Sequence, residues 1–226
     1  MRRLPELLIF LATVALTHGS PLRLMPLGDS ITDGDAIHGS YRGKLWELLK
    51  DAGYEIDFVG SESGGRVFSL KDLRSDRDHE GHWGWRTDEV IAKLDRWLRL
   101  NPPDVVLIHL GSNDIFQGEK PDQIIGELSK VVAMIRQQKP QAIILIAKII
   151  GSDAMPVETA SLNRAIDQLA ELDTPESPVR IVDQATGFDP AKDTYDGIHP
   201  TVAGAEKLAK TWFDALKEVL PAPAVK

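Results

Sequence analysis

The segment DVVLIHL, residues 104–110, is almost uninterrupted in apolar character. Such a run is typical of a strand that is buried on both faces of a parallel sheet. His109 lies inside the run, where we expect a core histidine whose hydrogen bonds are satisfied by its neighbours. The polar sequence GSND follows at residues 111–114. The segment therefore predicts a central strand with polar side chains just beyond its carboxyl end.

Apolar runs and amphipathic stretches alternate on both sides of this strand. The other predicted strands are residues 22–27, 56–59, 143–149 and 179–182. The predicted helices are residues 41–52, 87–100, 122–138, 157–172 and 202–219, with Thr87 as the cap of the second. The alternation predicts an α/β fold, with a five-stranded parallel sheet covered by helices on both faces. Residues 60–86 are rich in Gly, Ser and charge, and we expect a long functional loop there.

The composition narrows the class of protein. At 226 residues the chain is long enough for one domain with a substantial core. A formal net charge of -8 without a long basic tract argues against a nucleic-acid partner. There are no cysteines, which excludes disulfides, thiolate metal sites and a cysteine nucleophile. An uncharged ligand, such as a carbohydrate ester, suits this acidic chain.

The first residues have the layout of a secretory signal peptide. Arg2 and Arg3 precede an apolar run at residues 7–16, and a small residue follows at a plausible cleavage point. A membrane anchor and a first helix of the domain are the alternatives, but the run is shorter than the roughly 20 residues of a bilayer span. We therefore predict a signal peptide over residues 1–19 and a single domain over residues 20–226, secreted and free of the membrane after cleavage.

Two short segments at opposite ends of the chain carry the side chains of a serine hydrolase. GDSIT at residues 28–32 supplies Ser30, and DGIHP at residues 196–200 supplies Asp196 and His199. The aspartate and the histidine are three residues apart, so on one turn they point to the same side. There the carboxylate orients the imidazole, which takes the proton of the serine hydroxyl. The alternatives are a serine that only caps a helix and a loop carboxylate beside a surface histidine.

Donors for an oxyanion are predicted in the middle of the chain. Asn113 follows the central strand, so we expect its side-chain amide at the same sheet edge as Ser30. Gly84 lies within HWGW at residues 82–85 and offers a backbone N–H with no side chain in the way. With the N–H of Ser30 they make an oxyanion hole of three donors. The structural alternatives are an Asx turn at Asn113 and a left-handed loop position at Gly84.

Together these four segments resemble the SGNH, or GDSL-like, hydrolase superfamily. Its four motif blocks carry Ser, Gly, Asn and His, which correspond here to Ser30, Gly84, Asn113 and His199, with Asp196 as the third member of the triad. The resemblance covers nearly the whole mature chain. It implies a flavodoxin-like three-layer α/β/α fold and ester hydrolysis through an acyl-serine, with no metal or organic cofactor. The Gly-x-Ser-x-Gly elbow of α/β-hydrolases is absent from the sequence.

A narrower resemblance is to carbohydrate esterase family 3, whose members are acetyl xylan esterases. The matching segments are MPLGDS at 25–30, GSYR at 39–42, DFVG at 57–60 and DHEGHWGW at 78–85. The resemblance implies an acetylated xylan as the substrate. Trp83 departs from the family pattern, because a small residue, often serine, is expected at its position. This departure bears on the shape of the acyl or sugar pocket.

Other polar and aromatic residues near these segments have weaker assignments. Trp83 and Trp85 are candidates for stacking on a sugar, against packing within the loop. Tyr41 and Arg42 are candidates for binding the substrate or for holding the site together. A dense group of acidic residues and histidines matches no helix-based zinc motif, so we expect a hydrogen-bonded loop or a structural cation rather than a catalytic metal. The group consists of Asp76, Asp78, His79, Glu80 and His82.

The sequence thus predicts an exported serine esterase that removes acetyl groups from a carbohydrate, with xylan as the first choice. A lipase, lysophospholipase or thioesterase of the same superfamily is the alternative enzyme. It needs an apolar acyl channel, which the polar segment at 61–86 does not favour. A carbohydrate-binding protein is the non-enzymatic alternative, but it has no need of Ser30, Asn113, Asp196 and His199 together. We expect no cofactor and no nucleic-acid partner, and the oligomeric state stays open.

Overall fold

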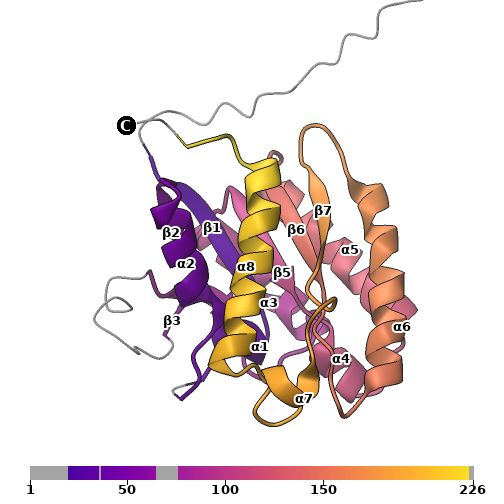
Figure 1. Ribbon diagram of the computed structural model, residues 1–226. Helices are drawn as coiled ribbons and strands as arrows, with labels where there is room; N and C mark the ends of the chain where they lie inside the picture. The colour runs from indigo at the N-terminus through magenta and orange to yellow at the C-terminus, as the bar shows by residue number, and fades with distance from the viewer. Residues whose placement is uncertain (1–19, 36, 65–75, 224–226) are drawn as a thin grey trace, which may run out of the picture.

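Strands and helices alternate through residues 20–35, 37–64 and 76–223, the parts of the chain that the computed structural model describes (Figure 1). The strands are β1 (Leu22–Gly28), β2 (Ile56–Phe58), β3 (Glu62–Ser63), β4 (Asp78–Gly81), β5 (Val105–His109), β6 (Ile143–Lys148) and β7 (Val179–Asp183). The helices are α1 (Ser30–Asp33), α2 (Tyr41–Asp51), α3 (Thr87–Leu100), α4 (Ser112–Phe116), α5 (Pro121–Gln138), α6 (Pro156–Ile166), the 3-10 helix η2 (Asp167–Leu172), α7 (Pro190–Asp193) and α8 (Val202–Val219).

The five predicted strands form the body of the sheet. β2, β1, β5, β6 and β7 lie side by side in that order, and every pair is parallel. β5 lies in the middle, as its apolar sequence predicts. The α/β fold class is therefore confirmed. The loops that follow β1 and β5 leave the sheet at the same edge, because carboxyl ends of parallel strands face the same way.

Across the described residues the sheet has seven strands rather than the predicted five. The additional strands, β3 and β4, lie in the segment for which we expect a loop. β2 pairs only with residues 22–24 of β1, and β4 pairs with Leu27 and Gly28 farther along the same edge. β4 has the sequence DHEG, which shows no apolar alternation. Its backbone extends the sheet, and His79 and Glu80 are buried with hydrogen-bond partners, so no hydrophobic pattern marks it.

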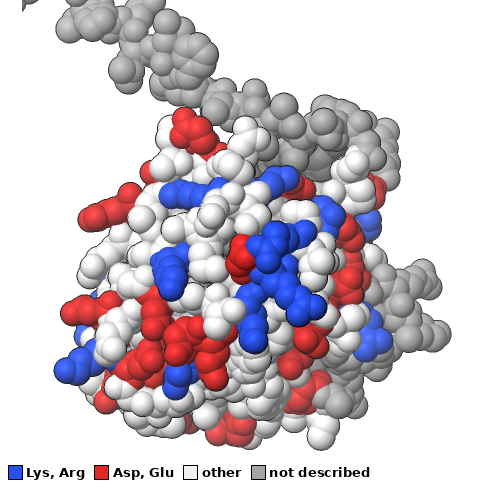
Figure 2. All heavy atoms as spheres, turned by 180° about the vertical axis from the view of Figure 1, so that it is seen from behind, with Lys and Arg blue, Asp and Glu red and all other residues white. Residues whose placement is uncertain are grey.

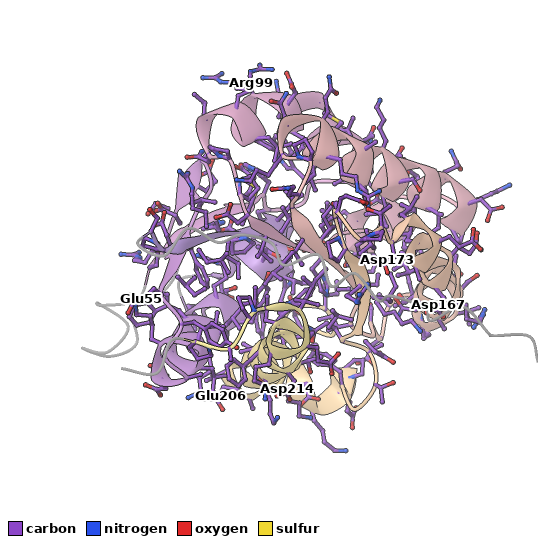
Figure 3. The ribbon with its side chains drawn as sticks, turned by 90° about the horizontal axis from the view of Figure 1, so that it is seen from above. Glu55, Arg99, Asp167, Asp173, Glu206 and Asp214 are labelled. Carbon is purple, nitrogen blue, oxygen red and sulfur yellow. The ribbon has the colours of Figure 1, made fainter. Side chains whose placement is uncertain are left out.

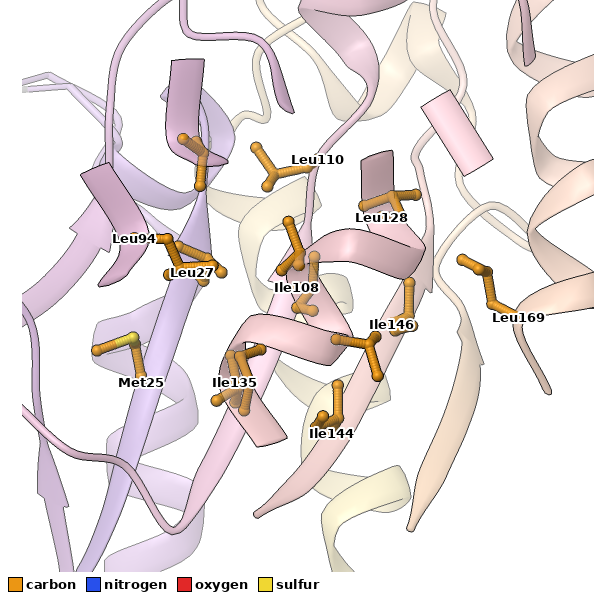
Figure 4. Packing of buried hydrophobic residues seen from close by; sticks show 14 of the residues in the cluster. Met25, Leu27, Leu94, Ile108, Leu110, Leu128, Ile135, Ile144, Ile146 and Leu169 are labelled. Atoms are coloured by element: carbon orange, nitrogen blue, oxygen red, sulfur yellow. The ribbon is translucent and has the colours of Figure 1, made fainter. Parts of the chain in front are cut away.

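Two apolar cores fill the space on either side of the sheet. Alternate residues of β5 point to opposite faces, so Ile108 packs with α3, α5 and α6, and Leu107 packs with α2 and α8. Figure 4 shows Ile108 together with Leu128 of α5 in the first of these cores. Burial of each such side chain contributes about 1.5–3 kcal/mol. Seen from above, Arg99 of α3 and Asp214 of α8 mark the two outer layers (Figure 3).

The longer helices follow the predicted pattern with two differences. α3 and α8 have the predicted bounds. Thr87 is the first residue of α3 rather than its cap; the cap is Arg86, whose N–H donates to the Glu89 carboxylate at 2.9 Å. The helix expected through residue 172 ends at Ile166 and continues as the tighter η2. Helices commonly tighten in this way at their ends, and Leu169 of η2 is buried in the core.

Three short helices, α1, α4 and α7, carry no apolar period and are not predicted from the sequence. Figure 1 shows them gathered at one end of the sheet. Asp29 caps α1, because its Oδ1 accepts the N–H of Ile31 at 2.9 Å. Gly28 is required at the preceding turn, since a Cβ there would lie 2.7 Å from the carbonyl oxygen of His109. The close approach of β1 and β5 at this turn places α1 beside the end of the central strand.

No helix within residues 20–35, 37–64 and 76–223 is long and apolar enough to cross a membrane. The predicted signal peptide, residues 1–19, lies outside the described residues. Its assignment therefore rests on the sequence.

Candidate active site

Ser30 and His199 meet at the carboxyl edge of the sheet although they are 169 positions apart in the chain. Ser30 is the first residue of α1, and His199 lies in the loop between α7 and α8. The hydroxyl oxygen of Ser30 is 2.9 Å from Nε2 of His199. The structure thus brings together the two segments that the sequence places at opposite ends of the chain.

Asp196 sets the orientation of the His199 ring. Its Oδ2 lies 2.7 Å from Nδ1 of His199, and its Oδ1 accepts the backbone N–H groups of Ile198 at 3.0 Å and His199 at 2.7 Å. Burial acts to raise the pKa of Asp196, but these hydrogen bonds outweigh it and leave the pKa below its usual value. An ionised carboxylate only accepts hydrogen bonds, so Nδ1 carries the ring proton. Nε2 then faces Ser30 with a lone pair that can take the hydroxyl proton.

A tight turn presents Asp196 and His199 on one side. The N–H of Tyr195 donates to the carbonyl of His199 at 3.0 Å and closes the turn. Gly197 has φ +85°, in the left-handed region that favours glycine, and its N–H donates to the Thr194 hydroxyl at 2.9 Å. The glycine of the DGIHP segment is therefore needed for the turn that aligns the carboxylate with the imidazole.

Two of the three predicted oxyanion donors, Gly84 and Asn113, come from segments that a hydrogen bond joins. Asn113 is the second residue of α4, and its Nδ2 donates to the carbonyl of Trp85 at 2.9 Å. This bond uses one of the two amide protons and leaves the other for a ligand. Gly84 has φ +79° and borders open space, since a β-carbon added there would meet no atom within 4 Å beyond its chain neighbours. It is a left-handed loop position, as the structural alternative predicts, next to the residue that anchors Asn113.

His199 belongs to a group of stacked rings, which we call the aromatic stack. Its members are His38, Tyr195, His199 and Trp83. The Trp83 and His199 ring centroids are 4.7 Å apart, with the planes inclined by 18°. Tyr195 lies 5.8 Å from His199, and His38 stacks on Tyr195 at 3.8 Å. Asp35 holds the far end of the stack, 2.9 Å from Nδ1 of His38. The stack constrains the plane of the His199 ring, while Ser30 and Asp196 occupy its two nitrogens.

Sequence reasoning missed three members of this neighbourhood: Asp35, His38 and Tyr195. Tyr195 directly precedes the DGIHP segment, and an aromatic residue beside the Asp-His pair is the signal that points to it. Asp35 and His38 follow Ser30 at a spacing that matches no motif, so nothing local to them indicates their place.

A small pocket opens beside the Ser30 hydroxyl. Its walls include Gly39, Tyr41, Trp83 and Tyr195. The Tyr41 ring is fully buried and its hydroxyl lies 3.1 Å from the Thr32 hydroxyl. Tyr41 therefore forms part of the pocket wall, while its hydroxyl is bonded within the protein.

Arg42 supports the site and does not line this pocket. Its guanidinium is buried and donates to four backbone carbonyls, those of Thr32 (2.8 Å), Asp33 (2.9 Å), Gly64 (3.1 Å) and Arg77 (2.9 Å). These bonds join α1 to the segments that flank β3 and β4. The sequence predicts two roles for Arg42, substrate binding and support of the site. The position fits the supporting role and does not fit substrate binding, because the guanidinium is bonded to backbone carbonyls.

Trp85 packs inward, unlike Trp83. Its ring stacks on His82 at 4.5 Å and lies 5.8 Å from Trp97 of α3. Loop packing therefore describes Trp85 better than sugar stacking. Trp83 is 48% exposed beside the pocket, where a bound sugar can reach it.

The acidic and histidine group around β4 is a hydrogen-bonded network. Glu80 is fully buried, accepts the N–H and the hydroxyl of Ser61 at 2.8 and 2.6 Å, and lies 2.7 Å from Nε2 of His82. Asp76 accepts a backbone N–H of β2 at 2.6 Å. Burial lowers the pKa of His79 to about 3, so this ring is neutral and accepts a backbone N–H within β4 at 3.0 Å. Of the two expectations for this group, hydrogen bonding within the protein describes it, although Asp78, His79 and Glu80 lie in a strand rather than in a loop.

His109 is buried in β5, as expected, but only one of its ring nitrogens is bonded. Nε2 accepts the N–H of Ile150 at 3.4 Å, and burial lowers the pKa of His109 to about 4, so the ring is neutral. Nδ1 is buried and has no hydrogen-bond partner among the described residues. The expectation of a fully satisfied core histidine is therefore half right.

Comparison with known proteins shows which family the chain belongs to. The model of the GDSL-like lipase/acylhydrolase family matches residues 27–207, which is most of the chain. The chain belongs to this family. The matched region of this GDSL-like hydrolase begins just before Ser30 and ends just after His199, so it contains all of the candidate active-site residues. The fold and the family together make the protein a carboxylic ester hydrolase.

This GDSL-like hydrolase is similar to solved carbohydrate esterases of family 3. One such enzyme from Talaromyces cellulolyticus is 29% identical with a TM-score of 0.79, and the match covers 88% of this chain and 97% of that one. A family 3 carbohydrate esterase from Clostridium thermocellum is 30% identical with a TM-score of 0.75 and the same coverage. The resemblance to carbohydrate esterase family 3 that the motifs indicate is therefore confirmed.

Curated relatives of this GDSL-like hydrolase are esterases as well. A multidomain esterase from Ruminococcus flavefaciens is 26% identical over 249 residues, which cover 96% of this chain and 32% of that protein. The chain thus spans about a third of the length of this relative. An arylesterase from Vibrio mimicus is 26% identical over 151 residues, 66% of each protein. These matches agree with ester hydrolysis as the activity.

Proposed function

We propose that this hydrolase removes acetyl groups from carbohydrates, with acetylated xylan as the natural ester, through an acyl-serine intermediate. The observation that carries the proposal is the chain of two hydrogen bonds, 2.9 Å from Ser30 to His199 and 2.7 Å from His199 to Asp196. The similarity to family 3 carbohydrate esterases and to an acetyl esterase with bound acetate, 29% identical, supports the substrate class.

In the first step Ser30 Oγ attacks the ester carbonyl carbon while Nε2 of His199 takes its proton. The new bond to carbon converts the carbonyl oxygen into an oxyanion, and His199 becomes a cation that Asp196 stabilises. The oxyanion is received by the N–H groups of Ser30 and Gly84 and by the free amide proton of Asn113. The hydrogen bond from Asn113 to the Trp85 carbonyl supports this role, because it holds the amide before substrate arrives.

In the second step the sugar leaves and water replaces it. His199 gives its proton to the sugar oxygen as the carbon–oxygen bond breaks, which leaves an acetyl group on Ser30. Water then attacks the acetyl carbon, His199 takes one of its protons, and the same donors receive the second oxyanion. Collapse of this intermediate returns the proton to Ser30 and releases acetate. Within this scheme every proton moves through one imidazole nitrogen, Nε2.

The walls beside Ser30 support a short acyl group and an outer sugar contact. Tyr41 lines the pocket, and Trp83, Tyr195 and His199 of the aromatic stack border it. A small pocket suits an acetyl group better than a long alkyl chain. Trp83 presents an exposed indole at the rim, which suits the apolar face of a sugar ring.

A substrate series tests this proposal. We expect the rate on p-nitrophenyl acetate to exceed that on the butyrate ester, and the octanoate ester to be a poor substrate. Acetate release from acetylated xylan should be detected with the purified enzyme and absent with Ser30→Ala. Equal or faster hydrolysis of the octanoate ester would contradict the acetyl specificity and favour a lipase or thioesterase.

We also propose that the protein is exported and that residues 1–19 are removed as a signal peptide. Arg2, Arg3 and the apolar run at 7–16 support this. Expression of the full chain in a bacterial host, followed by intact mass measurement of the exported fraction, tests it. We expect a mature chain that begins near residue 20, whereas a full-length chain confined to the cytoplasm would contradict export.

A further inference from the structure

Three carboxylates from different parts of the chain meet close to Asn113, and we call them the carboxylate cluster: Asp114, Glu119 and Glu127. Asp114 belongs to α4, Glu119 to the connection between α4 and α5, and Glu127 to α5. One oxygen of each lies within 4.8 Å of one oxygen of each of the others. Figure 2, which views the face covered by α3 and α5, shows acidic side chains gathered toward its lower edge.

Each carboxylate of the cluster has one buried oxygen without a hydrogen-bond partner in the described part of the chain. Asp114 is 0% exposed, and its Oδ2 has no hydrogen-bond partner in the described part of the chain. The Oε2 atoms of Glu119 and Glu127 are likewise inaccessible and without a partner among the described residues. A buried polar atom without a partner is costly, and a buried charge is more so. Three such atoms in one small space require a shared counter-charge or bound protons.

Within the described residues, the ion pairs leave the unpartnered oxygens of the cluster without a counter-charge in contact. Arg86 is the cation recorded at the cluster, and its Nε lies 3.8 Å from the outer oxygen of Glu119. Its other contacts go to Asp88 at 2.8 and 2.9 Å and to the side chain of Gln117 at 2.6 Å. The outer oxygen of Asp114 accepts the N–H of Thr87 at 2.9 Å, which anchors the start of α3. One oxygen of each carboxylate, Oδ2 of Asp114 and Oε2 of Glu119 and Glu127, is left without a hydrogen-bond partner among the described residues.

We propose that the carboxylate cluster binds a single Ca²⁺ ion. Calcium takes six to eight oxygen ligands at about 2.3–2.6 Å in a flexible arrangement, and carboxylates are its main protein ligands. Oxygens within 4.8 Å of one another fit around one ion of this size. Mg²⁺ requires shorter bonds of about 2.0–2.1 Å and a strict octahedron. Zn²⁺ in proteins is held mainly by Cys and His, which the cluster lacks.

The place of the cluster indicates what the ion would do. Asp114 directly follows Asn113 in α4, and its outer oxygen also holds the first residue of α3. An ion shared with Glu119 and Glu127 would tie α4 to α5 and fix the helix that carries Asn113. The expected role is structural support of this corner of the domain, with no part in bond breaking.

Thermal unfolding of the full chain tests the site independently of catalysis. The protein is treated with EDTA, dialysed, and melted with CaCl₂, with MgCl₂, or with NaCl at matched ionic strength. At a CaCl₂ concentration about 100 times Kd we expect the midpoint to rise by about 5–10 °C. Titration calorimetry should give one Ca²⁺ per chain. No saturable rise with CaCl₂ would overturn the proposal, and an equal rise with MgCl₂ would overturn the choice of Ca²⁺.

Single substitutions test whether these carboxylates cause the Ca²⁺-dependent rise in the unfolding midpoint. Glu127→Gln should abolish the Ca²⁺-dependent shift, and in EDTA it should melt no lower than the wild type because it relieves repulsion within the cluster. Glu119→Gln is the second variant and should also lose the shift. Asp122→Asn removes a carboxylate from the exposed surface of the same helix and should keep the full shift. An undiminished shift in both cluster variants would overturn the assignment to these residues.

Discussion

The Trp83 indole lies nearly parallel to the His199 imidazole, with centroids 4.7 Å apart and planes inclined by 18°. This contact occurs at the position where the sequence departs from the pattern of carbohydrate esterase family 3. A small side chain there would leave the same face of the imidazole uncovered. The departure therefore has a structural consequence: the tryptophan packs against the proposed general base.

Loss of this contact should reduce activity moderately. Aromatic pairs contribute about 0.5–1.5 kcal/mol beyond their buried area, which corresponds to a fall of about 2- to 12-fold in kcat/KM for Trp83→Ala on p-nitrophenyl acetate. Trp83→Phe keeps a stacked ring and should keep most of the activity. Wild-type kinetics in the alanine variant would show that the stack does not position His199.

Asn113→Ala should lower kcat and leave the fold intact. Removal of one oxyanion donor costs about 10²- to 10³-fold in kcat. Asn163→Ala is a matched control, because Asn163 also donates its amide to a backbone carbonyl, that of Ile149 at 2.8 Å. The control should lose similar stability and retain activity. If both variants lose activity to the same degree, the effect of Asn113 is structural and the oxyanion assignment is wrong.

The hydrophobic pattern of the sequence predicts those elements of the fold in which apolar residues are buried and polar residues are exposed. The continuous burial of β5 and the apolar stripes of α3 and α8 follow directly from residue type, and the bounds of both helices agree with the sequence. β4 was not predictable in this way, because it pairs through its backbone while Glu80 and His79 are buried by hydrogen bonds. Helices as short as α1 and α4 contain too few residues to show a period.

Some residues of the candidate site could likewise be predicted from the sequence, and others could not. Ser30 and Asn113 each follow a buried strand, so the rule for parallel sheets is enough to place them at one edge. The ring stack of His38 on Tyr195 depends on the conformation of two loops, and no spacing in the sequence encodes it. The contacts of Arg42 could not be predicted from the sequence either, since its partners are carbonyl groups that every residue possesses.

Arg42→Ala should destabilise the domain rather than weaken substrate binding. The substitution leaves buried carbonyls without donors, and we expect a loss of about 3 kcal/mol or more in the free energy of unfolding by urea. Arg96→Ala removes an exposed arginine on α3 and should change stability by less than about 0.5 kcal/mol. An Arg42→Ala variant with wild-type stability and a raised KM would place the guanidinium in contact with substrate.

Asp29 should give the protein a measurable loss of stability at high pH. Burial raises the pKa of Asp29 to about 7, against 3.8 for the free side chain. Between these values the folded state keeps a proton that the unfolded chain releases, so stability from this group falls as pH rises from about 4 to about 7. Urea unfolding should therefore be measured for Asp29→Asn and for the wild type at pH 5 and at pH 8. We expect the free energy of unfolding of the variant, relative to the wild type, to be about 2–3 kcal/mol higher at pH 8 than at pH 5.

Asp57→Asn, which removes an exposed carboxyl on β2, is the control for this pH series. The comparison of each variant with the wild type at the same pH cancels the titration of all other groups. A stability difference between Asp29→Asn and the wild type that stays constant from pH 5 to pH 8 would show that Asp29 ionises normally in the fold.

The central claim is that Ser30 attacks the ester while His199 takes its proton. Its most direct test is the kcat of Ser30→Ala on p-nitrophenyl acetate, measured on protein whose melting temperature matches the wild type. We predict a fall of about 10⁴-fold or more, since loss of the nucleophile leaves only binding and the oxyanion donors. Hydrolysis by a folded Ser30→Ala variant within about tenfold of the wild-type rate would contradict the account.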